Sequence, residues 1–477
     1  MMQIPQQLDL LANGHEVTLF ESLAEVGMGA HAHTVETADG QVTVDVPFRV
    51  FNERHYRNFA AILTSLGIEW EMCNYAASYS ALESGEVYFR YANWLIGAFS
   101  LPYLPFASLF STSGWAVAKD FYRWISSAKL DLDAGRLDGL TMGEYLDSRG
   151  YSDLFQHRVF FPIMAIIMTC DIDSMRQYPA DMVVGAFTNG RGRGVKRALG
   201  GTDAIVAALS ANIANVHCSA AVTAVKRGCT ETKPVVEFSI AGGDAQSVEF
   251  DHVIIATQPE HVLKLLQDPS PELKSILSLW GSETSDVVVH TDPSLMPADR
   301  SAWSPINVLL SDSGSPRPMA TMWLNQLHPA LAHHEVNIFQ TWNPLANPAP
   351  DSVITSSTFS RPVMCPTASK AANGLSALQG DGGVWMAGSY ARYGLPLLEN
   401  GVCSALDVVS RMGVPLPDFV DIPEPYGAAS VPPTRSALWL VTKALVVVST
   451  LAAATVTGLR WRAKLPLLPA SLTAPLS

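Results

Sequence analysis

The stretch that most constrains the fold of this chain is LLANGHEVTLFES, at residues 10–22. In it a turn leads into a short apolar run, VTLF, which ends on the acid Glu21. This pattern is typical of the second strand of a Rossmann βαβ unit, where the acid holds a ribose hydroxyl of a dinucleotide. The stretch therefore predicts an α/β nucleotide-binding domain.

The glycine-rich half of that unit is missing from the sequence. A glycine fingerprint should lie about 20 residues before the acid, yet none of residues 1–13 is a glycine. Two explanations are open: the chain starts too far downstream, by truncation or a mis-set start, or the fingerprint was lost in evolution. The otherwise well-formed pattern favours the first explanation. We therefore expect an α/β fold with a discontinuous Rossmann-like domain that lacks its first strand.

Composition limits the class of protein and its partners. At 477 residues the chain can bury a large core and hold more than one domain. Charged residues make up 16%, well below the about 25% of an average soluble protein, and the net charge of -13 argues against nucleic acid as a partner. The basic residues Arg191, Arg193, Lys196 and Arg197 are interpreted as a solvated loop rather than an anion site.

The cysteines and histidines show no metal-binding pattern. Six scattered cysteines without a CxxC pair indicate reduced thiols in a cytosol-facing protein. The pairs His31/His33 and His333/His334 are too close together to be ligands one helical turn apart. We therefore expect no metal site.

The C-terminal region contains a candidate transmembrane helix at residues 436–459. Its length of roughly 36 Å as a helix is enough to cross a bilayer, and Lys443 near its start could reach the interface. A buried or amphipathic terminal helix is the alternative. The protein is accordingly expected to be membrane-associated with a cytosolic catalytic domain, or cytoplasmic if this helix is not inserted.

Periodicity gives an outline of the secondary structure. Residues 55–67 have helical spacing and end on a glycine, and residues 90–185 read as a largely helical, apolar domain that lines a pocket. Residues 284–345 alternate apolar and polar side chains, which predicts an antiparallel sheet.

In this order the local motifs resemble the flavin amine oxidase and phytoene desaturase superfamily, and most closely its amine oxidase-like FAD/NAD(P)-binding oxidoreductases. The resemblance covers nearly all of residues 14–413. The motifs that carry it are HEVTLFES, VGMGAHAHTV, VDVPFRVFNERHYRNF, VKRALGGTDAIVAALS, FDHVIIATQPEHVLKLL, VVVHTDPSLMPADRSAW, TMWLNQL and AGSYARYGLPLLENG.

The resemblance implies a division of the chain into segments. Residues 1–50, 186–262 and 376–413 correspond to a discontinuous FAD-binding domain, 51–185 and 263–375 to an α+β substrate domain, and 414–435 to a linker before the apolar helix.

The resemblance also implies cofactor-binding residues from the first two FAD-binding segments. Glu21 is the ribose acceptor, and Gly27 and Gly29 let the backbone approach the FAD closely. The family's adjacent glycine pair is split here, which alters the turn. Val222 matches the strand that meets the adenine, and Thr257 ends the strand behind the dinucleotide.

A third group of implied cofactor residues comes from the last FAD-binding segment. Gly388 ends a strand, Gly394 allows a tight turn, and Glu399 and Gly401 lie where a helix begins. The N-terminus of a helix suits a phosphate or the electron-rich pyrimidine edge of a flavin.

No catalytic residue can be named from the sequence. His31, Arg49 and Asn52 are candidates near the flavin ring, and Tyr390 and Tyr393 are candidates for the substrate side, although structural roles fit all five equally well. A flavin takes hydride from a C–H bond without a strict acid–base pair, so this is no contradiction.

Three functions follow from the resemblance. The first is an FAD-dependent oxidoreductase of desaturase type, which removes hydride from a small apolar substrate such as a lipid, isoprenoid or polyketide-like molecule. The second is an amine oxidase on the same fold, because fold does not decide the reaction. The third, raised by the missing glycines, is a cofactor-free pseudo-oxidoreductase with a binding role.

Overall fold

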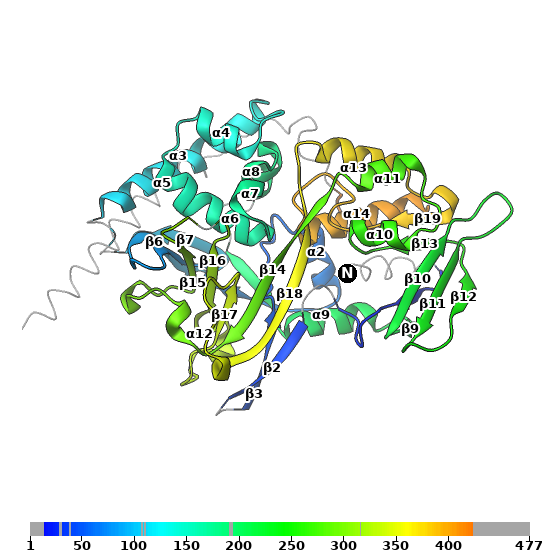
Figure 1. The fold of residues 1–477 in the computed structure, drawn as a ribbon, viewed down its shortest axis with the longest axis horizontal. Helices are drawn as coiled ribbons and strands as arrows, with labels where there is room; N and C mark the ends of the chain where they lie inside the picture. Colours follow the sequence, from blue (N-terminus) through cyan, green and yellow to red (C-terminus); the bar gives the residue numbers. More distant parts are fainter. Residues whose placement is uncertain are drawn as a thin grey trace, which may run out of the picture.

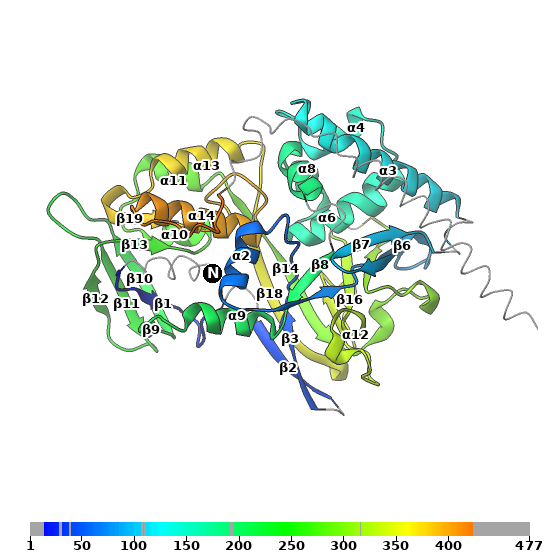
Figure 2. The same cartoon turned by 180° about the vertical axis from the view of Figure 1, so that it is seen from behind.

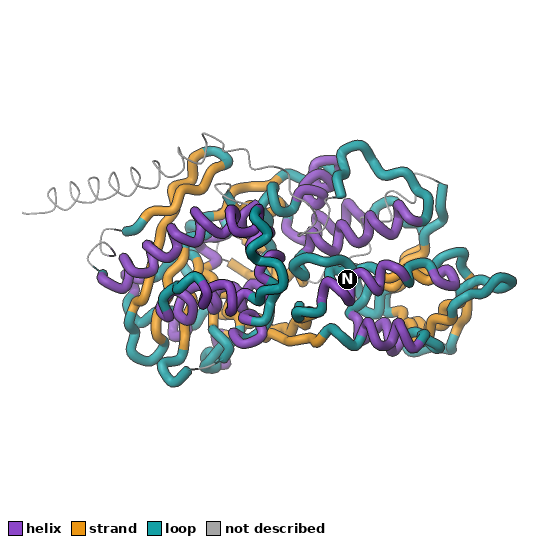
Figure 3. The backbone as a smooth tube through the Cα atoms, turned by 90° about the horizontal axis from the view of Figure 1, so that it is seen from above, coloured by secondary structure: helices purple, strands orange, loops and turns teal. Residues whose placement is uncertain are grey.

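The molecule consists of two lobes joined by long strands, as a computed structural model shows (Figure 1). The structure describes residues 14–27, 31–37, 40–105, 108, 111–189, 194–314 and 316–422. We call one part the parallel-strand lobe, which contains β1, β9–β13, β19, α10, α11, α13 and α14, and the other the large-sheet lobe, which contains β5–β7, β14–β18 and α3–α8. The reverse view and the view from above show helices in both lobes (Figure 2 and Figure 3). This mixed arrangement confirms the α/β class.

The parallel-strand lobe is built around two short parallel strand pairs. β1 (Thr18–Phe20) pairs with β9 (Asn215–His217), and β13 (Val253–Ile255) pairs with β19 (Val384–Met386). Each pair joins segments more than a hundred residues apart in the sequence, as a discontinuous domain requires. In the part of the chain that the structure describes, neither β1 nor β13 has a second strand neighbour. Among the described residues the two parallel pairs therefore belong to separate sheets.

An antiparallel sheet and several helices complete this lobe. The sheet has the order β10-β11-β12. Its strands and the helices are β10 (Ala220–Lys226), β11 (Val235–Ile240), β12 (Gln246–Glu249), α10 (Pro259–Leu265), α11 (Pro271–Leu277), α13 (Ala368–Ala377), the 3-10 turn η7 (Asp381–Gly383) and α14 (Leu398–Arg411). The buried residues of α14 are largely apolar, with Glu399 and Ser404 as polar members, and their packing fixes the helix in the lobe.

Several elements lie between the lobes. They are β2 (His31–Thr37), β3 (Gly40–Val46), α2 (Arg57–Ser65), β4 (Trp70–Cys73), β8 (Val195–Ala198) and α9 (Gly201–Ser210). The helix expected at residues 55–67 is confirmed by α2, and Gly67 follows it with a φ of 71°. Residues 436–459 lie outside the described residues, so the apolar C-terminal helix remains a prediction.

The interpretation of the basic cluster as a solvated loop is wrong for its second half. Lys196 and Arg197 are each only 8% exposed. Lys196 forms an ion pair with Glu53, and Arg197 forms one with Glu71 across the β4–β8 ladder. The aliphatic parts of both side chains are buried and their charged groups are paired with carboxylates, so these cations can lie in a strand. The first half of the cluster lies outside the described residues.

The large-sheet lobe contains an eight-stranded sheet with the order β18-β14-β17-β16-β15-β5-β6-β7. Neighbouring strands are antiparallel except β5 and β15. The strands are β5 (Ala77–Ala81), β6 (Val87–Ile96), β7 (Phe99–Tyr103), β14 (Gly281–His290), β15 (Ile306–Leu310), β16 (Met319–Trp323), β17 (Phe339–Trp342) and β18 (Val353–Val363). The antiparallel sheet expected from residues 284–345 is thus confirmed.

Helices cover one face of this sheet (Figure 1). They are α3 (Thr112–Asp133), α4 (Met142–Ser148), α5 (Asp153–Phe155), the π-helical turn η2 (Gln156–Phe160), α6 (Phe161–Met168), α7 (Ile172–Arg176) and α8 (Ala180–Asn189). Shorter pieces are α12 (Leu324–Leu327), η3 (Pro293–Leu295), η4 (Arg300–Ala302), η5 (Pro329–Leu331) and η6 (Pro350–Ser352). The helical prediction holds for the later part of residues 90–185 and is wrong for residues 90–103, which form the β6–β7 hairpin around Gly97.

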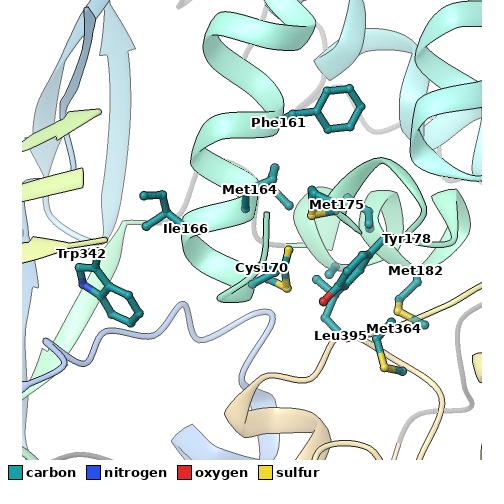
Figure 4. Packing of buried hydrophobic residues seen from close by; sticks show 14 of the residues in the cluster. Phe161, Met164, Ile166, Cys170, Met175, Tyr178, Met182, Trp342, Met364 and Leu395 are labelled. Atoms are coloured by element: carbon teal, nitrogen blue, oxygen red, sulfur yellow. The ribbon is translucent and has the colours of Figure 1, made fainter. Parts of the chain in front are cut away.

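The core of the large-sheet lobe is rich in sulfur and aromatic side chains. Figure 4 shows Cys170 and Tyr178 packed with the methionines of the neighbouring segments. Met164, Met175 and Met182 are at most 3% exposed. Their flexible thioethers fill irregular gaps between helices, and each fully buried side chain of this size contributes about 1.5–3 kcal/mol. This core holds the end of α6 against the sheet.

Candidate functional site

A large cavity runs from the parallel-strand lobe to the large-sheet lobe. Its volume is about 1380 Å³, more than the roughly 300–1,000 Å³ of a typical small-molecule pocket. Its wall is made by β1, β13, the first residues of α14, and parts of β10, β17 and β18. Residues of both β1 and β13 lie in this wall, so the cavity reaches both parallel pairs.

The strand-end acid lies in the wall of this cavity. Glu21 follows β1, and its Oε1 accepts hydrogen bonds from Leu23 N at 3.0 Å and Ser22 Oγ at 3.2 Å. These bonds hold the carboxylate at the start of the next turn. Gly27 also lies in the wall, whereas Gly29 is outside the described residues.

Two further predicted residues line the cavity from the other strands. Val222 in β10 and Thr257 after β13 are both in the wall. The buried Oγ1 of Thr257 has no hydrogen-bond partner in the described structure. A buried hydroxyl without a partner is costly, and a bound polar ligand would relieve that cost.

The segment between β19 and α14 divides into residues that line the cavity and residues that do not. Gly388 is in the wall, and its N–H donates to Ser404 Oγ at 2.9 Å. A Cβ on Gly388 would lie 2.7 Å from the ring of Tyr390. Gly394 is not in the wall; a Cβ there would lie 2.6 Å from Asn400 Oδ1. Gly401 is buried within α14 and is likewise not in the wall.

Glu399 points away from the cavity. Its carboxylate accepts hydrogen bonds from Asn58 N at 2.9 Å, Phe59 N at 3.0 Å and Asn58 Nδ2 at 3.1 Å. It therefore binds the N-terminus of α2, where acceptors are favoured. Burial raises the pKa of Glu399, and the hydrogen bonds from α2 oppose that rise. The first turn of α14 nevertheless lines the cavity through Leu397 and Leu398.

The five catalytic candidates separate in the same way. Arg49 and Tyr390 lie in the wall. Asn52 stabilises a turn by accepting from Arg54 N at 3.1 Å, and Tyr393 donates to both carboxylate oxygens of Asp181 at 2.9 Å. The backbone of His31 belongs to β2.

Three residues that were not predicted also line the cavity: Thr169, Trp342 and Arg361. Thr169 ends α6 in the left-handed conformation, with φ 58° and ψ 44°, which is unusual for a β-branched residue. Arg361 lies in β18, and its positive charge acts on Arg49. Burial and the charge of Arg361 together lower the pKa of Arg49 to about 10. Arg361 stands in a strand of mostly polar side chains, and nothing in the local sequence indicates that it lines a ligand cavity.

Comparison with known proteins identifies the family. The family model described as flavin containing amine oxidoreductase matches residues 8–357. This chain belongs to that family. The protein is therefore a flavin-dependent oxidoreductase. Its cofactor is FAD, as expected from the sequence. No curated protein matches the chain significantly by sequence.

Solved structures share the fold at low sequence identity. Fatty acid isomerase from P. acnes, described as producing CLA, matches with a TM-score of 0.58 and 13% identity over 86% of this chain and 95% of that one. Cyclohexylamine oxidase from Brevibacterium oxydans IH-35A gives 0.56 and 13%, over 86% and 96%. A triple mutant of putrescine oxidase gives 0.56 and 14%, also over 86% and 96%.

The described residues of the flavoenzyme fit an FAD. The cavity has room for it, an acid lies at the end of β1, and the N-terminus of α14 faces the cavity. The partnerless hydroxyl of Thr257 provides a polar group for the cofactor to satisfy. The assignment of Glu21, Gly27, Val222, Thr257 and Gly388 to cofactor binding stays a prediction that this placement allows.

The described residues contain neither a metal-binding cluster nor a membrane-spanning helix. There, no group of histidine, cysteine and acidic residues is arranged to hold a metal ion. Over the same part of the chain, none of the helices has both the length and the hydrophobicity needed to span a bilayer.

Proposed function

We propose that this flavoenzyme removes hydride from an apolar substrate such as a lipid, isoprenoid or polyketide-like molecule, in a reaction of desaturase type. The observation that carries the proposal is the continuity of the cavity. It extends from the strand-end acid at Glu21 to a wall that contains Trp342, Phe359 and Tyr390. A cofactor at the acid end would thus share the cavity with aromatic side chains, which suit binding of a hydrocarbon.

The residues of the chain would bind and orient the partners of the reaction. Glu21 would hold the ribose, and the N-terminus of α14 would face the electron-rich edge of the flavin. When bound, the flavin supplies the hydride acceptor. Tyr390 and Trp342, which line the cavity, would exclude water and position the substrate chain.

Amine oxidation is the second candidate, supported by the names of two structural neighbours, a cyclohexylamine oxidase and a putrescine oxidase. Two arginines in the cavity wall disfavour it, although acids such as Glu21 and Asp203 line the same cavity. Arg49 and Arg361 both lie in the wall, and a protonated amine would be repelled by two guanidinium groups. The fatty acid isomerase among the neighbours shows that the fold also accepts a lipid.

The test is anaerobic reduction of the FAD-loaded chain by candidate substrates. Loss of the oxidised flavin absorption is expected with fatty acids or isoprenoids, and no loss is expected with cyclohexylamine or putrescine. Reduction by the amines alone would contradict the proposal and support an amine oxidase. A purified chain that takes up no FAD would support the cofactor-free alternative.

A further inference from the structure

We propose that Arg49 and Arg361 form a binding site for the carboxylate at the end of an apolar substrate. This inference rests on the proposed function, because it names the polar group that an otherwise apolar substrate carries. The two arginines come from segments about 300 residues apart, the turn after β3 and the strand β18, and both lie in the cavity wall.

The first argument is electrostatic. Two guanidinium groups that share a partly buried site repel each other, and burial together with Arg361 lowers the pKa of Arg49 to about 10. Burial lowers the pKa of Arg361 as well. An anion between two such groups would offset both effects, and the planar guanidinium matches a carboxylate in geometry.

The second argument concerns Arg361 and its neighbours. Its Nη1 donates to the carbonyl oxygen of Ile167, and among the described residues no carboxylate forms an ion pair with it. The groups that act on its pKa are Tyr178, Tyr56 and Cys170. Burial raises the pKa of Tyr56 to about 12 and raises that of the other two, so all three are neutral near pH 7.

The nearby acids have partners of their own. Asp45, which acts on Arg49, accepts from Thr202 N at 2.9 Å and Thr202 Oγ1 at 2.7 Å. Glu283, whose charge acts on the pKa values of Cys170 and Tyr178, pairs with Arg317 at 2.8 Å. These contacts leave the carboxylate of a ligand as the natural counterion for Arg361.

The third argument is the wall around the pair. Thr169, 1% exposed, lies two residues after Ile167, whose carbonyl Arg361 binds, and holds a left-handed conformation that costs a β-branched residue about 1–3 kcal/mol. Strain of this kind is concentrated at ligand sites. Among the described residues the buried indole N–H of Trp342 has no hydrogen-bond partner, and Phe359 gives apolar surface in the same wall. A polar end and an apolar body are therefore accommodated together.

FAD itself also carries groups that a pair of arginines could bind. These are its anionic phosphates and the electron-rich pyrimidine edge of its flavin. The experiment must therefore distinguish a substrate carboxylate from the cofactor. Isothermal titration of the FAD-loaded full chain with decanoate, decanol and decylamine provides the comparison, since the three probes share one apolar chain. FAD content per protein is measured in parallel for each variant.

We expect the wild-type chain to bind decanoate about 10- to 100-fold more tightly than decanol, and decylamine more weakly than decanol. Arg361→Met should remove the preference for decanoate and leave decanol binding and FAD content unchanged, whereas Arg361→Lys should keep part of it. Arg57→Met is the matched control, because Arg57 is exposed in an ion pair with Asp421. A thermal melt of each variant shows that it is folded.

Three outcomes would overturn the carboxylate site. They are equal binding of decanoate and decanol by the wild type, equal weakening of both by Arg361→Met, and loss of FAD in Arg361→Met, which would assign the pair to the cofactor. Calorimetry detects the binding of the probe directly and does not depend on reduction of a flavin. A chain that prefers decanoate but takes up no FAD would therefore contradict the proposed oxidation and still support the carboxylate site.

Discussion

Replacing Glu399 by alanine should destabilise the protein through α2 without affecting the cavity directly. The carboxylate satisfies the backbone N–H groups of Asn58 and Phe59, and it is buried, with 7% of the residue exposed. Each buried N–H left without an acceptor costs about 1–3 kcal/mol. Asn58 Nδ2 keeps Asp421 O as an acceptor at 2.8 Å and adds little. The sum is a loss of about 2–6 kcal/mol, and Glu399→Gln, which keeps one acceptor oxygen, should lose about 1–3 kcal/mol.

The measurement combines urea unfolding with hydrogen exchange of the α2 amides. Exchange of α2 should rise more than exchange of α11 in Glu399→Ala. Glu272→Ala, at an exposed position in the first turn of α11, is the control and should change stability by less than about 0.5 kcal/mol. If Glu399→Ala behaves like the control, the reasoning is refuted. If it keeps its stability but loses FAD, Glu399 binds the cofactor as the sequence first suggested.

Three further predictions concern single side chains. Gly388→Ala brings a methyl group against the ring of Tyr390 and should cost about 1–3 kcal/mol and weaken FAD binding, measured by FAD titration; unchanged affinity would contradict the close approach. Burial lowers the pKa of His290 from 6.5 to about 4, so its unfolded form binds more protons between these values and stability falls as pH drops through that window. His290→Gln should remove up to about 3 kcal/mol of this acid sensitivity in unfolding curves from pH 7 to 4, and an unaltered curve would count against it. Tyr393→Phe removes the hydroxyl that donates to buried Asp181 and should lower the free energy of unfolding in urea by about 1–3 kcal/mol. An unchanged free energy of unfolding would indicate that water solvates the pair.

Local sequence signals predicted those parts of the fold that depend on neighbouring residues. The strand before Glu21, helix α2 and the alternating strands of the large sheet follow from short-range periodicity. The β6–β7 hairpin was missed because its apolar run around Gly97 has no clean alternation, and an apolar run alone does not separate strand from helix.

The candidate site was only partly predictable, because side-chain direction depends on contacts far along the chain. Arg49 and Tyr390 were named and do line the cavity, but Arg361 has no local pattern that connects it with Arg49. Glu399 lies in the expected turn of α14, yet its carboxylate turns to residues of α2 more than 300 positions away. The position of a residue in an element could be inferred; the partner of its side chain could not.

The long ladder between β14 and β18 has a consequence for how the enzyme admits its substrate. The ladder runs without a break in hydrogen bonding from Gly281 paired with Val363 to the irregularity after Val289, and Figure 1 shows it passing between the lobes. Two paired strands resist bending far better than a single linker does. The lobes should therefore not open and close as hinged halves, and substrate entry should depend on rotation of individual side chains and short loops at the cavity mouth. Turnover would then be sensitive to the bulk of those side chains more than to the solvent viscosity that slows large-scale domain motion.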